Sequence, residues 1–156
     1  MTQTKVIGES VKQTNRSFVK AYANDYAKAI TKNYFDYHMN QLTRFGHPNP
    51  DYANEQIAEI ENGTANLMKF EIREGRKYYK VVQVEFETSN GSKYYQQYRD
   101  SSVHSFVDKE TGEVFKPASW NRPAKHVRFT FQKPEHIRFL CDSRNVDWAG
   151  GYLYLR

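Results

Sequence analysis

The sequence predicts a single domain of the α+β class, in which N-terminal helices pack on a mostly antiparallel β-sheet. Residues 10–62 carry apolar side chains at spacings of three and four, as helices do, whereas residues 66–156 show apolar alternation and turn signals. Helices followed by strands are typical of α+β proteins. A chain of 156 residues is long enough for one hydrophobic core, so we expect one domain over residues 1–156.

The first helix is predicted over residues 10–45. Ser10 followed by Gln13 resembles a capping box at its start, and Gly46 is a typical stop. A helix of this length would extend for roughly 50 Å, so we expect either one long helix or two consecutive helices with a break near residues 31–33. Its core-facing stripe should consist of Val19, Ala23, Tyr26, Ile30, Tyr34 and Tyr37.

A second, shorter helix is predicted over residues 51–62. Asp51 is a residue type that often accepts a hydrogen bond from the first turn, so we expect it to be the N-cap. Asn62 and Gly63 follow the last apolar residue of the pattern and predict the end of the helix.

Three strands are predicted within residues 67–100, separated by turns at Glu74-Gly75 and Asn90-Gly91. Asn-Gly is the strongest short signal for a tight β-hairpin. Apolar residues of the middle strand alternate with polar ones, so we expect one face of the sheet to be buried and the other to be exposed to water. These apolar residues are Val82, Val84 and Phe86.

The C-terminal part of the chain predicts further β structure. Residues 102–116 form a second hairpin pattern that closes around Thr111-Gly112. Residues 125–131 alternate well enough for an edge strand, and residues 152–156 predict another strand at the end of the chain.

Positive charge is concentrated in one segment. The chain has a formal net charge of +5, and residues 1–115 are neutral overall. Residues 116–144 contain seven Lys or Arg against two Asp or Glu, which accounts for the whole excess. A partner of opposite charge, such as a nucleic acid, is therefore expected to bind this segment.

The segment KPASWNRPAKHVR, residues 116–128, combines a tryptophan with two prolines and several cations. The prolines restrict the backbone, so the loop could present its side chains at low entropic cost. Trp120 could stack on a base while the cations contact phosphates, but it could instead fill a gap in the core or anchor a protein partner. The candidate binding residues of this segment are Lys116, Trp120, Arg122, Lys125, His126 and Arg128.

Two tyrosine pairs flanked by lysine lie on either side of the Asn90-Gly91 turn. We expect Tyr78 and Tyr94 on adjacent strands, with one tyrosine of each pair exposed on the sheet. Aromatic rings beside cations on a sheet can stack bases, although cross-strand tyrosines also stabilise ordinary sheets.

No catalytic, metal or cofactor signature is expected. His136 and Cys141 are not accompanied by the second cysteine or close histidine pair that a zinc site would need. His104 and Asp108 lack a neighbouring nucleophile or paired acid, and no glycine-rich phosphate loop precedes a predicted helix.

The sequence also lacks an apolar run of about 18 residues and a secretory signal, so we expect no membrane partner and a cytoplasmic location.

The C-terminal third resembles a group of small, uncharacterised proteins encoded by bacteriophages. The resemblance is carried by the hairpin Phe106–Phe115, the segment Lys116–Lys125 with Trp between two prolines, and a closing Gly-Tyr-Leu-Tyr-like strand at residues 151–155. It implies a phage origin and expression in the cytoplasm of a bacterial host, and it implies no assigned activity.

Two functions follow as hypotheses. The first is binding of a polyanion, most simply a nucleic acid, by the basic C-terminal third with little sequence specificity. The second is binding and inhibition of a host protein in phage takeover or defence evasion, with Trp120 and the aromatic strands as the interface. The two hypotheses predict different responses to salt, because phosphate contacts weaken steeply as salt rises.

Overall fold

The computed structural model describes residues 2–154, with the side chains of residues 16–154, and confirms the α+β class. Three α-helices accompany one five-stranded antiparallel sheet in this part of the chain, with strand order β1-β2-β3-β4-β5. The helices are α1 (Thr2–Thr43), α2 (Pro50–Glu61) and α3 (Pro134–Leu140). The strands are β1 (Lys69–Glu74), β2 (Tyr78–Phe86), β3 (Tyr98–Asp108), β4 (Glu113–Phe115) and β5 (Phe129–Thr130), and a 3-10 helix, η1 (Gly151–Leu153), follows them.

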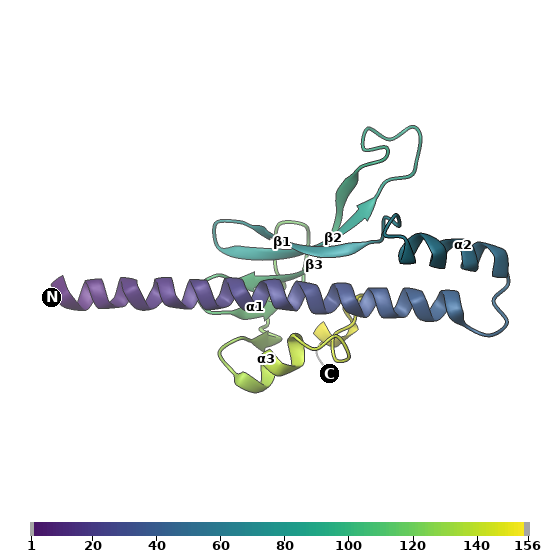
Figure 1. Ribbon diagram of the computed structural model, residues 1–156. Coiled ribbons are helices and arrows are strands. Elements are labelled where there is room, and N and C mark those ends of the chain that lie inside the picture. Colours follow the sequence, from purple (N-terminus) through teal and green to yellow (C-terminus); the bar gives the residue numbers. More distant parts are fainter. Residues whose placement is uncertain (1, 155–156) are drawn as a thin grey trace.

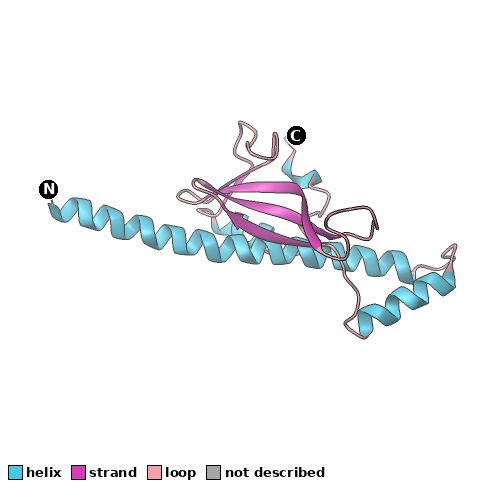
Figure 2. Cartoon of the chain, turned by 90° about the horizontal axis from the view of Figure 1, so that it is seen from above, coloured by secondary structure: helices cyan, strands magenta, loops and turns pink. Residues whose placement is uncertain are grey.

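The long helix α1 is the axis of the molecule. The sheet lies along one side of α1, whereas α3 and the C-terminal segment lie along another (Figure 1). Seen from above, the strands cross over the middle of the helix, and α2 folds back beside its C-terminal end (Figure 2). The core therefore forms where α1 meets both layers.

The predicted stripe of α1 is largely correct. Its first four members are buried, Tyr34 is half-buried, and Tyr37 is 47% exposed beside Trp148. These side chains meet apolar residues of the sheet and of the C-terminal segment. The shared core contains Val19, Ala23, Tyr26, Ile30, Phe70, Tyr79, Val81, Val107, Val114, Phe131, Leu140, Val146 and Leu153.

The predicted start of α1 is wrong, because the helix already includes Ser10 and no capping box begins there. Of the two alternatives for its length, one long helix is correct, since α1 runs without a break through residues 31–33. Polar residues at the suspected break bond to other elements instead of interrupting the helix. The Thr31 hydroxyl accepts a hydrogen bond from the Phe70 amide at 2.9 Å, and Asn33 bonds with two backbone groups of the C-terminal segment.

Helix α2 is confirmed, but its N-cap lies two residues earlier than predicted, at Asn49 instead of Asp51. The side chain of Asn49 accepts a hydrogen bond from the Tyr52 amide at 3.1 Å, and Pro50 occupies the first turn. Proline is favoured there because its missing N–H would have no helical partner. Asp51 is instead an acidic residue of the first turn.

The hairpin at Thr111-Gly112 and the edge strand β5 are confirmed, whereas the tight turn at Asn90-Gly91 is not. β2 ends at Phe86 and β3 begins at Tyr98, so residues 87–97 form a projecting loop (Figure 1). The loop is closed by hydrogen bonds between Glu87 and Gln96 or Gln97.

The end of the chain also differs from the prediction. Residues 152–154 do not form a strand, because Gly150 turns the backbone with φ +84° and η1 follows it; residues 155–156 lie outside the described part. Helix α3 was not predicted from the sequence. It has only seven residues, which is too short for a clear helical period, and it begins at a proline.

One face of the central sheet packs on α1 and the other carries charged side chains that stay partly exposed, but the valines of β2 do not all lie on the buried face as predicted. Val81 and Val82 are adjacent in β2 and both are fully buried. Because successive residues of a strand point to opposite faces, Val81 faces α1 and Val82 faces away from it. On that outer face an ionic chain joins Glu71, Arg73 and Asp100, and the long side chains cover the valine.

Candidate nucleic-acid interface

The basic segment forms a compact hairpin that follows β4. The Ala124 amide donates to the Lys116 carbonyl at 2.8 Å, and Pro117 and Pro123 lie opposite each other. Two amides, at residues 118 and 119, donate to the Arg122 carbonyl. This closure leaves residues 120 and 121 at the tip of the hairpin, so the two prolines frame the tip.

Trp120 at the tip is anchored but not buried. The Lys80 ammonium lies 5.1 Å from the centre of the Trp120 ring and 5.9 Å from that of Phe106, and it donates to Asn121 Oδ1 at 3.0 Å. Trp120 nevertheless stays 44% exposed. Trp120 is therefore not the core filler considered from the sequence, but a ring fixed in place with part of its surface accessible.

Tyr78 lies under this hairpin on the outer face of the sheet. Its ring packs edge-on against Phe106 at 5.7 Å and Phe115 at 6.2 Å, and the Lys77 ammonium lies 5.4 Å from its centre. Tyr78 is half-buried. Alternation along β2 places Tyr78 and Lys80 on one face, so Lys80 could have been predicted to join the candidate site.

The cations of the basic segment are not neutralised by carboxylates. Among the side chains of residues 16–154, none of six basic residues between positions 116 and 138 has a carboxylate oxygen within 4.0 Å. Cations elsewhere on the sheet, such as Arg73 and Arg99, do form ion pairs. The six residues are Lys116, Arg122, Lys125, Arg128, Lys133 and Arg138.

The cations of the hairpin differ in their availability. Arg122, Lys125 and His126 are exposed. Arg128 is half-buried, and its guanidinium donates to the carbonyl oxygens of Leu153 and His126, each at 2.6 Å. Arg128 therefore holds the C-terminal segment against the hairpin, and its substitution would disturb structure as well as charge.

Tyr94 does not join this group, and the predicted pairing of the two tyrosine motifs on adjacent strands is wrong. Tyr94 lies in the loop 87–97, is 40% exposed and has the Lys93 ammonium 5.0 Å from its ring centre. The loop follows the far end of β2, and Lys80 lies near its beginning. At about 3.3 Å per residue, six residues separate the two places by roughly 20 Å.

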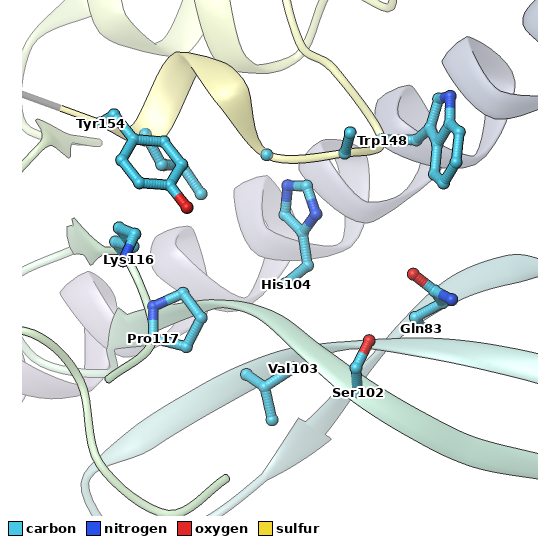
Figure 3. Close-up of a pocket in the computed structure, with 11 residues that line it drawn as sticks. Gln83, Ser102, Val103, His104, Lys116, Pro117, Trp148 and Tyr154 are labelled. Atoms are coloured by element: carbon cyan, nitrogen blue, oxygen red, sulfur yellow. The ribbon is translucent and has the colours of Figure 1, made fainter. Parts of the chain in front are cut away.

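His104 and Asp108 have separate surroundings. Val81 pairs with Ser105 and Val82 with Val103, which leaves His104 as the extra residue of a β-bulge. His104 is buried beside the C-terminal segment (Figure 3). Asp108 instead accepts hydrogen bonds from the amides of residues 110 and 111 and stabilises the β3–β4 turn.

A buried hydrogen-bonded chain links α1, η1 and β3 through His104. The Tyr26 and Tyr152 hydroxyls are 2.5 Å apart, and the Tyr152 hydroxyl lies 2.7 Å from His104 Nε2. Burial lowers the pKa of His104 to about 4, while a hydrogen bond with the Trp148 backbone opposes that change. Burial also raises the pKa of Tyr26 to about 12. The three hydrogen-bonded side chains are thus uncharged at neutral pH.

Neither a metal cluster nor a membrane span is found in the described residues. No three side chains among His, Cys, Asp and Glu converge there in a way that could hold a metal ion. None of the described helices combines the length and the apolar character needed to cross a bilayer.

Comparison with known proteins gives a family without an assigned activity. The model of a family of unknown function, DUF7717, matches residues 5–155, so the chain belongs to this family. No curated protein and no solved structure matches the chain.

Proposed function

We propose that this member of the DUF7717 family binds nucleic acid with little sequence specificity through the hairpin at residues 116–128. The observation that carries the proposal is the half-exposed ring of Trp120, fixed at the tip of a hairpin whose exposed cations have no carboxylate partner among the described side chains.

The electrostatic part of the proposal rests on Lys116, Arg122 and Lys125. None of the three has a carboxylate partner among the described side chains, so their charges can contact phosphates. Neutralising phosphates releases condensed counterions, which supplies most of the affinity in non-specific binding. These contacts do not distinguish one base from another, because phosphate is common to all nucleotides.

The aromatic part rests on Trp120. Every base has a π-face, so stacking on a ring tolerates any sequence and contributes about 1–3 kcal/mol per base. Lys80 holds the indole in place before binding, which lowers the entropic cost of stacking.

The salt dependence of affinity tests the electrostatic part. Replacing Arg122 and Lys125 together by Gln should make the slope of log affinity against log salt shallower by roughly 1.4 for single strands, at about 0.7 per phosphate contact. The matched control replaces Lys28 of α1 and Arg44, which directly follows that helix; both are exposed, and the slope should stay unchanged. No measurable affinity of the wild-type protein for DNA or RNA at low salt would refute the proposal.

Trp120→Ala tests the aromatic part. Affinity should fall by about 1–3 kcal/mol, while the melting temperature should change less than for a fully buried aromatic residue, whose removal costs about 3–5 kcal/mol. The smaller stability cost follows from the 44% exposure of the ring. An unchanged affinity in a folded Trp120→Ala protein would exclude stacking at this position.

A second candidate function is inhibition of a bacterial host protein. An exposed tryptophan beside an arginine, as in Trp120 and Arg122, is also the composition of protein interface hot spots. The resemblance to bacteriophage proteins supports a phage origin and the host cytoplasm as the place of action for either function. Binding to a host protein that persists at high salt, without affinity for nucleic acid, would favour this candidate.

A further inference from the structure

A pocket of about 450 Å³ lies directly beside the hairpin. It is formed by β2, β3, the first residues of the hairpin and the C-terminal segment, and His104 lies at its floor (Figure 3). Lys116 and Pro117 line the pocket and also begin the hairpin that carries Trp120. The pocket and the hairpin therefore share Lys116 and Pro117.

The lining of the pocket has one cation and no carboxylate. Lys116 is the charged residue among those that line it, since His104 is neutral above its lowered pKa. Gln83 and Ser102 contribute an amide and a hydroxyl from neighbouring positions of β2 and β3, which pair with each other in the sheet. A ligand with one negative charge and a hydrogen-bonding edge fits these groups.

An aromatic ring forms one side of the pocket. Figure 3 shows the Tyr154 hydroxyl directed toward the interior, with Lys116 beside the ring and Gln83 on the opposite side. The Lys116 ammonium lies 4.6 Å from the ring centre, and Tyr154 is 60% exposed. The ring can therefore stack on a flat group while Lys116 stays close to a charge attached to that group.

The floor keeps its shape because His104 is held from two directions. Its ring is hydrogen-bonded to Tyr152 and to the Trp148 backbone. Gly150, with φ +84°, brings the C-terminal segment close to this ring, since a Cβ at that position would lie 3.8 Å from His104 Cε1. The pocket is thus formed before any ligand binds.

We propose that this pocket takes one unstacked base of a single-stranded nucleic acid, with the base on Tyr154, its edge toward Gln83 and Ser102, and its phosphate at Lys116. The proposal rests on the proposed function, since the hairpin must first hold the strand. A base in a duplex is stacked and paired, and its extrusion costs a few kcal/mol. The protein therefore prefers single strands to duplexes.

The test compares a labelled single strand of about 12 nucleotides with the corresponding duplex by fluorescence anisotropy. Tyr154→Ala should weaken single-strand binding by roughly 5- to 150-fold and leave duplex binding unchanged. Ser102→Trp, which fills the pocket and retains every cation, should have the same effect. Tyr52→Ala is the matched control, since Tyr52 is a similarly exposed tyrosine on α2.

The possible failures are distinct. If the wild-type protein binds neither form, the proposed function fails and the pocket proposal fails with it. If it binds both forms with the expected salt dependence but with equal affinity, or if Tyr154→Ala behaves like Tyr52→Ala, only the pocket proposal is overturned. Circular dichroism of each variant shows that the fold is retained, and the exposed position of Tyr154 favours that result.

Discussion

Replacing His104 by Gln should remove most of the acid sensitivity of folding between pH 7.5 and pH 5. In the folded protein the pKa of His104 is lowered to about 4 by burial, whereas a histidine of the unfolded chain keeps the ordinary value of 6.5. Below pH 6.5 the unfolded chain therefore binds a proton that the folded protein does not. Folding stability is complete above pH 6.5 and is lost as pH falls toward 4.

The magnitude follows from these two pKa values. At pH 4 the free energy of unfolding has decreased by roughly 3 kcal/mol, at about 1.4 kcal/mol for each pH unit. At pH 5 the loss is already roughly 2 kcal/mol. For a protein of this size that corresponds to a decrease in melting temperature of about 4–8 °C. Glutamine retains a side-chain hydrogen-bonding group toward Tyr152 but cannot be protonated in this range.

The assay is urea or thermal unfolding of both proteins at pH 7.5, 6.5, 5.5 and 5 at constant ionic strength. Carboxylates with lowered pKa, such as Glu71 and Asp142, lose their contributions below about pH 4.5, outside this range. His38 has a pKa lowered by partial burial, so His38→Gln should remove a smaller part of the same sensitivity. His126→Gln, at an exposed position, is the surface control.

The quantity to compare between the two proteins is the slope of the free energy of unfolding against pH. The stability at neutral pH is not informative, because His104→Gln also disturbs the contact with Tyr152 and lowers stability at every pH. Parallel curves for wild type and His104→Gln from pH 7.5 to pH 5 would refute the reasoning. They would mean that His104 reaches solvent in the folded protein and titrates as it does in the unfolded chain.

Two further substitutions test the fold that positions the hairpin. Gly112→Ala should destabilise the protein by about 1–3 kcal/mol, because φ is +73° at this position and the new Cβ would lie 3.1 Å from Phe131 Cβ. The control is Gly91→Ala, whose Cβ would have no atom within 4 Å. It should leave stability nearly unchanged in the same unfolding assay. Asn33→Ala should cost about 1–3 kcal/mol, because Asn33 bonds with the Trp148 amide and the Ser143 carbonyl. Exposed Asn24→Ala is its control, and equal melting temperatures for the two asparagine variants would contradict the role given to Asn33.

The sequence was informative where a local period decides the structure. The stripe from Val19 to Ile30 identifies the buried face of α1 because helical spacing is a property of the chain itself. The Thr111-Gly112 turn is equally local, since Gly112 has positive φ. By contrast, the sequence could not decide between one long helix and a break near residues 31–33, because the polar Thr31 is satisfied by β1, which is remote in sequence.

The candidate pocket could not be predicted for the same reason. Gln83, Lys116 and Tyr154 come from three separate parts of the chain and meet only after the sheet and the C-terminal segment are assembled. The bulge at His104 has no sequence signature comparable to Asn-Gly, and the Asn-Gly signal itself was wrong because residues 87–97 form a longer closed loop.

The intermediate exposure of Trp120 follows from the chemistry of the sheet face beneath it. Much of that outer face is occupied by the ion pairs of Arg73 with Glu71 and Asp100, which favour contact with water. The apolar area left for the hairpin is the small cluster of Tyr78, Phe106 and Phe115, and the Lys80 ammonium lies between that cluster and the indole. A tryptophan placed over a cation at the border of a polar surface cannot be fully buried, so the residue that fixes its ring also keeps part of that ring open to a ligand.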